Sequence, residues 1–99
     1  GTRDQVGDPT KPMTFGLAQN TPNPFNPVTE IAFALPEEAD VTIDVYNVRG
    51  QRVKRLIDER KPAGWHTIRV EANDMASGVY FYRMQAGDYT ESRKMSILK

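Results

Sequence analysis

The stretch from Asn20 to Pro27 constrains the fold more than any other part of this sequence, because prolines stand at every second or third position. Proline fixes its own φ at about −65° and has no N–H for a β-ladder. It also drives the preceding residue toward β or polyproline conformation. Asn23 and Asn26 can close turns on their own backbone, and Phe25 is the one large apolar anchor. We expect an extended segment, neither helix nor central strand, that opens a β domain; its structural residues are Pro22, Asn23, Pro24, Phe25, Asn26 and Pro27.

Composition limits the class of protein. The 99 residues suffice for one small domain, and 13 Lys and Arg against 13 Asp and Glu leave no overall field that favours nucleic acid. The absence of cysteine excludes disulfides and thiolate metal sites. The sequence has no apolar run of roughly 18 residues and no signal peptide, so we expect no membrane span. The chain is either cytosolic or part of a longer exported precursor, and we favour the second.

Apolar residues alternate with polar ones along most of the chain after residue 27, as in half-buried strands. The predicted strands are Val28–Leu35, Val41–Tyr46, Gln51–Ile57, Trp65–Val70, Val79–Ala86 and Tyr89–Leu98, with an edge strand at Leu17–Asn20. Short strands at this spacing predict an immunoglobulin-like antiparallel β-sandwich of six or seven strands, with an open barrel as the alternative. We assign residues 1–16 to a flexible linker or cloning remnant and 17–99 to the domain, since 1–16 is polar and broken by proline.

The connections between these strands give more local predictions. Gly50 closes a turn that tolerates positive φ, and Gly87-Asp88 forms a tight hairpin. We expect Val53 to face the core and a bulge or strand end at Leu56-Ile57. Residues Asp58 to Gly64 are expected to be a charged turn closed by Pro and Gly.

We find no pattern that predicts catalysis or a cofactor. His66 is the only histidine, and its place inside a strand favours a packed or hydrogen-bonded structural role. Ser77, Ser92 and Ser96 lack the strained elbow of a nucleophile. The acid pairs Glu37-Glu38 and Asp58-Glu59 lie in turns, without the apolar pocket that a catalytic acid needs.

Weak binding sites are conceivable in two places. Asn73-Asp74 could ligate Ca²⁺ together with Asp88 if the two loops meet, but two ordinary polar turns are the simpler interpretation. The aromatic residues Tyr80, Tyr82 and Tyr89 could form a platform for sugar, although core packing is favoured in a thin sandwich. The basic residues near positions 52–61 fit a solvated edge that resists strand addition; they are Arg52, Lys54, Arg55, Arg60 and Lys61.

Several blocks together resemble the type A C-terminal sorting domains of the bacterial type IX (Por) secretion system, over about 17–99. The blocks are Leu17-Ala18-Gln19-Asn20, Pro22 to Pro27, Thr29-x-Ile31-x-Phe33, Val41-x-Ile43-x-Val45-Tyr46-Asn47, Gly50-Gln51-x-Val53, Ala63-Gly64-x-His66, Ala76 to Tyr82, Ala86-Gly87 and Lys94-Met95. The family usually has Tyr where Thr21 stands.

The resemblance implies an immunoglobulin-like fold and a non-catalytic role in export of a cargo protein to the cell surface. Its implied partners are the outer-membrane translocon, a cell-surface sortase that cuts the preceding linker, and lipopolysaccharide joined to the cargo. Gly78, Tyr80 and Lys94 match the C-terminal motif of the family. We expect a receptor to pair with the last strand by β-augmentation or to grip it at Lys99. For Gly78 and Tyr80, turning a loop and packing are equally good interpretations.

Two other functions remain open at this stage. The domain could be an accessory carbohydrate-binding module of an extracellular enzyme, which requires an exposed aromatic row that includes Trp65 or the tyrosines. It could also be purely architectural, like the sandwich of flagellar hook-capping proteins, in which case export would not depend on the last residues.

Overall fold

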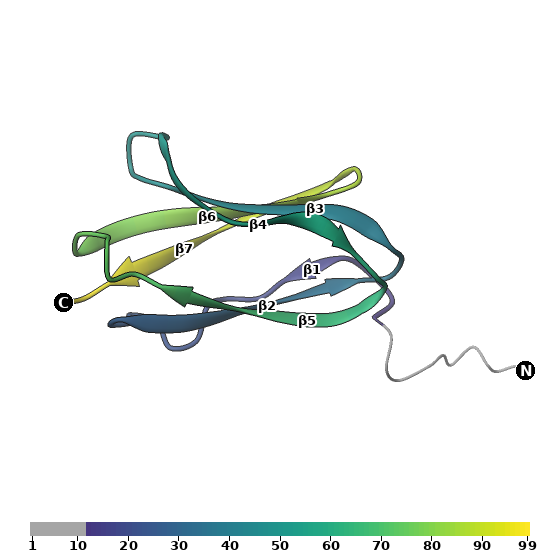
Figure 1. Ribbon diagram of the computed structural model, residues 1–99, viewed down its shortest axis with the longest axis horizontal. Coiled ribbons are helices and arrows are strands. Elements are labelled where there is room, and N and C mark those ends of the chain that lie inside the picture. Colours follow the sequence, from purple (N-terminus) through teal and green to yellow (C-terminus); the bar gives the residue numbers. More distant parts are fainter. Residues whose placement is uncertain (1–11) are drawn as a thin grey trace, which may run out of the picture.

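Across residues 12–99, which the computed structural model describes, seven β-strands form two antiparallel sheets packed face to face (Figure 1). The strands are β1 (Gly16–Leu17), β2 (Val28–Leu35), β3 (Ala39–Tyr46), β4 (Arg52–Lys61), β5 (Gly64–Glu71), β6 (Gly78–Ala86) and β7 (Tyr89–Ile97). Residues 1–11, most of the predicted linker, lie outside the described part. The β-sandwich prediction is confirmed.

The strand order is β1-β2-β5 in one sheet and β4-β3-β6-β7 in the other. In an immunoglobulin constant-type sandwich the fourth strand pairs with the first sheet. Here β4 pairs with β3 instead, so the second sheet gains a strand and its outer face is the broader of the two. The edge strands of that sheet are β4 and β7.

The core lies between the sheets and follows the predicted alternation. Inward-facing residues of β2 and β3 are fully buried, as are the matching positions of β6 and β7; the largest are Ile31, Phe33, Leu35, Val41, Ile43, Val45, Tyr82, Met84 and Met95. β-branched and aromatic side chains at every second position fit a pleated surface that is buried on one side. The sheets are held together mainly by removal of this apolar area from water.

Strand β4 contains the predicted bulge but departs from two other predictions, the orientation of Val53 and the extent of the charged turn. Ile57 pairs with Ile43 and Arg55 with Asp44, so Leu56 is the extra residue of the predicted bulge. A second irregularity follows, because Lys54 pairs with Val45 whereas Arg52 pairs with Tyr46. The prediction that Val53 faces the core is therefore wrong: it is the extra residue there and 46% exposed. Each bulge reverses which face the following side chain takes.

The predicted charged turn at Asp58–Gly64 is also wrong in its extent. Residues Asp58 to Lys61 continue β4, in register with Ala39 to Thr42, and only Pro62 and Ala63 connect it to β5. A run of charges can stand in a strand at this place because β4 is an edge, where charged residues discourage association with another chain.

The segment from Asn20 to Pro27, called the strap below, runs along the sandwich in an extended conformation. Its first residue, Asn20, is fully buried. The Asn20 amide donates to the Pro22 carbonyl at 3.0 Å and to the Thr29 hydroxyl at 3.1 Å, and that hydroxyl donates to the same carbonyl at 2.8 Å. Phe25 is buried in the core, as predicted, and the peptide bonds before the three prolines are cis. Buried polar groups are thus satisfied inside the strap.

The first edge strand is shorter than predicted. β1 covers only Gly16 and Leu17, followed by one hydrogen bond from the Ala18 amide to the Ala32 carbonyl and a bridge between Thr21 and Glu30. Before it, the ring of Phe15 stacks on Tyr89 with centroids 5.3 Å apart. Contact with the sandwich therefore begins earlier than Leu17.

Candidate recognition surface

The strap covers the outer edge of β7. The Phe25 amide donates to the Ser96 carbonyl and the Leu98 amide donates to the Phe25 carbonyl, both at 3.0 Å. Between them, the Ser96 amide donates to Asn23 Oδ1 at 2.9 Å. Phe25 thus forms a parallel bridge with Ile97 and brings its ring into the core at the same point.

Two further hydrogen bonds cover the edge of β7 toward the middle of the strand. Gln19 Nε2 donates to the Lys94 carbonyl at 2.6 Å, and the Arg93 guanidinium donates to the Leu17 carbonyl. A strand added at this edge would have to displace these bonds. β-Augmentation along the C-terminal half of β7, as expected from the sequence, therefore conflicts with the folded state.

The four residues singled out for recognition lie in two places. Gly78 starts β6 with φ of 148°, opposite Ile97, and no atom lies within 4 Å of where its Cβ would be. Tyr80 packs partly against the core, and its hydroxyl donates to the Ala76 carbonyl at 2.9 Å. Lys99 joins the same region: its amide donates to Ser77 Oγ and its Nζ to the Asn73 carbonyl.

Lys94 lies apart from that group, on the outer face of the four-stranded sheet. It is the cross-strand partner of Phe81, which pairs with Tyr46, which in turn pairs with Arg52. These four residues form one row across all four strands, with a cation at each end and two aromatic rings between. Our sequence analysis did not assign the aromatic pair, although Tyr46 and Phe81 stand at outward positions of their strands.

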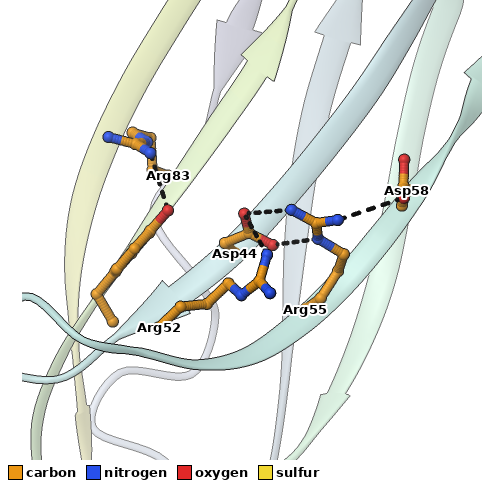
Figure 2. Close-up of polar contacts among 6 residues, drawn as sticks. Asp44, Arg52, Arg55, Asp58 and Arg83 are labelled. Carbon is orange, nitrogen blue, oxygen red and sulfur yellow. Dashed lines mark hydrogen bonds and ion pairs between the residues drawn. The ribbon is translucent and has the colours of Figure 1, made fainter.

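The neighbouring row consists of Arg55, Asp44, Arg83 and Ser92. Figure 2 shows the side chains of Arg55, Asp44 and Arg83. Arg55 holds the Asp44 carboxylate with two hydrogen bonds, Nε to Oδ1 at 2.8 Å and a terminal nitrogen to Oδ2 at 3.1 Å. Arg52 approaches the same carboxylate to 4.0 Å. The hydrogen bonds that Arg55 donates to Asp44 raise the pKa of the Arg55 guanidinium above its ordinary value. The negative charge of Asp44, which is almost fully buried, is therefore compensated by Arg55 and Arg52.

Arg83 is turned toward the aromatic row. Its guanidinium lies over the Tyr46 ring, 5.0 Å from the centroid, and donates to the Tyr46 hydroxyl at 2.8 Å. The cation–π contact fixes the position of the guanidinium over the ring and leaves its charge unpaired with any carboxylate of residues 12–99. Beside it the surface is hollowed over about 350 Å³, between the β3–β4 turn and the outward side chains of β6 and β7.

The loops do not form the conceivable calcium site. Asp74 pairs with Lys54 at 3.2 Å, and this hydrogen bond lowers the pKa of the Asp74 carboxyl. Asp88 lies at the other end of β6, so the two loops do not meet. Within residues 12–99 no group of three or more metal-binding side chains is found.

The predicted aromatic row is not an exposed platform either. Tyr82 is fully buried, Tyr89 is stacked under Phe15, and Tyr80 is partly packed. Trp65 is 64% exposed but lies in the other sheet, beside a small apolar hollow floored by Ala32 and Ala34.

His66 has the structural role expected for it. Its ring stacks on Phe33, with centroids 5.1 Å apart, and Nε2 lies 2.8 Å from the Pro62 carbonyl. Both contacts hold the start of β5 against β2, where the chain passes from one sheet to the other.

Comparison with protein families now adds the decisive observation. Residues 21–98, from the strap to the end of β7, match the family described as the secretion system C-terminal sorting domain. The chain belongs to this family. The match spans β2 to β7 and the segment from Thr21 to Pro27, whereas β1 and the block Leu17 to Asn20 precede it. A comparison with curated proteins gives no match.

As a sorting domain, the chain carries a signal for export by the type IX secretion system, and its place of action is the cell surface or the extracellular space. It interacts with the type IX machinery. Within the described residues we find no helix with the length and hydropathy that a membrane crossing requires.

Proposed function

We propose that the sorting domain acts as a folded, non-catalytic signal that the outer-membrane translocon recognises at the end of the sandwich formed by β6, β7 and the loop before β6. The observation that carries the proposal is the family match, which covers this whole unit. In this proposal the sortase cuts the linker within 1–16, and the cargo is joined to lipopolysaccharide. The polar, proline-broken sequence of this linker suits a protease.

The recognition residues divide by role. Lys94 has an exposed side chain on the sheet face, and Lys99 holds the last residues against the 73–77 loop. Both are candidates for direct contact with the translocon. Gly78 and Tyr80 serve the fold at this end: Gly78 adopts a φ that L-residues rarely take, and Tyr80 ties the loop to β6.

The absence of catalysis is part of the same proposal. It is supported by the engagement of His66 with Phe33 and Pro62, and by the acid pairs, whose carboxylates face solvent and ion-pair with Arg60 and Lys61. A catalytic acid would need an apolar surrounding that raises its pKa. We propose no cofactor.

The experiment is a fluorescent protein fused to residues 1–99 in a type IX-competent host, compared with a fusion that carries Lys94→Ala and Lys99→Ala. Deletion of the last residues is unsuitable, because Met95 and Ile97 belong to the core and their loss would unfold the domain. Surface display is measured by protease accessibility on intact cells, and folding by circular dichroism of the purified variants.

We expect the unaltered fusion at the surface and the folded double variant retained in the periplasm. A folded, unaltered fusion that stays in the periplasm would contradict sorting by this chain alone. Display of both fusions would keep sorting but place recognition elsewhere than at these two lysines.

A further inference from the structure

We propose that the two rows on the outer face of the four-stranded sheet form a docking surface for an acidic segment of a protein of the export machinery. This surface, called the basic-aromatic face below, consists of the two rows Arg52-Tyr46-Phe81-Lys94 and Arg55-Asp44-Arg83-Ser92. The inference rests on the proposed function, because it specifies the chemistry of the partner.

The positive charge of the face is only partly compensated, by Asp44 and by Asp58, which pairs with Arg55 at 3.4 Å. Its two rows carry four cationic side chains, Arg52, Arg55, Arg83 and Lys94, and a single acid, Asp44. Arg55 occupies both oxygens of that acid. Among residues 12–99 neither Arg83 nor Lys94 has an ion-pair partner within 4.0 Å. The chain as a whole is neutral, so this excess is local.

Two other outward regions of the described chain do not share this excess. At the far end of the same sheet, Arg60 pairs with Glu38 at 3.2 Å and with Asp40 at 3.3 Å. On the outer face of the other sheet, Arg69 pairs with Glu71 at 3.0 Å. Complementary potential steers association and selects partners, so the acidic partner is directed to one end of one face.

Exposed apolar side chains lie at the same end of the sheet, and a bound partner would bury them. Phe81 is 39% exposed and Val79 on the same strand 40%, while Val48 projects from the β3–β4 turn. Tyr46 and Phe81 border the hollow together with Val48. Exposed aromatic residues beside arginine are typical of the centre of protein interfaces.

The arrangement favours a protein segment over a diffuse anionic surface. Arg83 is fixed by its contact with the Tyr46 ring and by its hydrogen bond to the Tyr46 hydroxyl, so its remaining N–H groups are preorganised for a carboxylate, with Lys94 on the next strand. Carboxylates that alternate with apolar side chains along a segment would meet the cations and the aromatic rings in turn. The strap closes the β7 edge, which leaves the face as the open part of this end of the sheet.

The first test measures the chemistry directly on the whole purified chain. A synthetic peptide that alternates aspartate with isoleucine is titrated into the ¹⁵N-labelled protein, with its asparagine counterpart as control and phosphatidylglycerol vesicles as a second probe. We expect saturable amide shifts at Tyr46, Phe81, Arg83 and Lys94 with the aspartate peptide alone. Shifts confined to other residues, equal shifts with the asparagine peptide, no shifts, or binding to vesicles in place of the peptide would overturn the proposal.

The second test measures export with graded charge. Lys94 is replaced by Arg, Gln and Glu, and Arg83 by Lys, Gln and Glu, in the fluorescent fusion; Arg69→Glu on the opposite face is the matched control. We expect display close to the unaltered level for the cationic variants, several-fold lower for Gln and lowest for Glu, with Arg69→Glu unaffected. Circular dichroism and thermal unfolding confirm that each variant is folded.

The outcomes separate this inference from sorting itself. If the unaltered fusion is displayed and the Glu variants are displayed equally, the acidic docking surface is refuted while sorting stands. Equal losses for the Arg, Gln and Glu variants of Lys94 would also refute it, because a structural effect would then explain them. An unaltered fusion that remains in the periplasm refutes the sorting proposal, and the peptide titration then decides the inference by itself.

Discussion

The Tyr82 hydroxyl donates to the Ala18 carbonyl at 2.6 Å, across 64 residues of sequence. Tyr82 belongs to the four-stranded sheet and is fully buried, whereas Ala18 follows the short edge strand of the other sheet. This hydrogen bond thus links the two sheets on the side of the sandwich where the strap covers β7. Burial raises the pKa of the Tyr82 hydroxyl, which keeps it protonated as a donor.

Removal of this hydrogen bond should destabilise the domain. We expect Tyr82→Phe to lower the free energy of unfolding by about 1–2 kcal/mol, because the ring stays in the core and only the bond between sheets is lost. Urea denaturation measures the change. The control is Tyr80→Phe, whose bond to the Ala76 carbonyl is exposed and spans one loop. Equal losses for both variants would contradict a special role of the Ala18 contact.

The enclosed Asn20 makes a sharper prediction. Asn20→Asp keeps the shape of the side chain but replaces its amide donor by a carboxylate, which faces the Pro22 carbonyl and the Thr29 hydroxyl. One carboxylate oxygen would keep the hydrogen bond donated by Gln19 Nε2 at 2.7 Å, but the other would face the Pro22 carbonyl oxygen. A buried charge against a carbonyl is costly, so we expect this variant to unfold more readily than Asn20→Ala, which should lose about 1–3 kcal/mol. Burial would raise the pKa of this carboxyl in the folded state above its ordinary value of about 3.9, so the difference should shrink as pH falls toward 4 and be lost below it. A pH-independent difference would contradict the assignment.

The strap makes a local prediction about the β7 edge. Asn23→Ala removes the acceptor of the Ser96 amide but leaves both backbone bonds of Phe25. We expect faster hydrogen exchange at the Ser96 amide with a loss of about 1 kcal/mol in global stability. Asn26→Ala, at an exposed position of the same strap, is the matched control. Unchanged exchange at Ser96 would show that Asn23 does not guard this edge.

Sequence alone predicted most of the sandwich because alternation reports directly on which side of a strand is buried. It failed in β4, where two bulges change the face that a side chain takes, as at Val53. The bulge at Leu56 was predicted because two apolar residues in a row break the alternation, but the one at Val53 leaves no such break and depends on how β4 pairs with β3. The same limit applies to the site: Lys94 was singled out, but its row with Phe81 and Tyr46 exists only through pairing of distant strands.

The alkaline limit of stability should depend on Tyr89. Burial, together with the hydrogen bond to the Glu91 carboxylate, raises the pKa of Tyr89 from 10.0 to about 12. The folded state therefore binds a proton that the unfolded state releases, and this contribution is fully present below pH 10 and is lost as pH rises toward 12.

We expect the free energy of unfolding to fall less steeply over this pH range in Tyr89→Phe than in the unaltered chain. Glu91→Gln should be intermediate, because the burial of the phenol remains while the carboxylate acceptor is removed. Urea denaturation at several pH values measures the slopes, and ultraviolet absorbance follows the ionisation of the phenols. Parallel slopes in all three proteins would mean that Tyr89 ionises equally in the folded and unfolded chain, and its contact with Glu91 would then contribute nothing to alkaline stability.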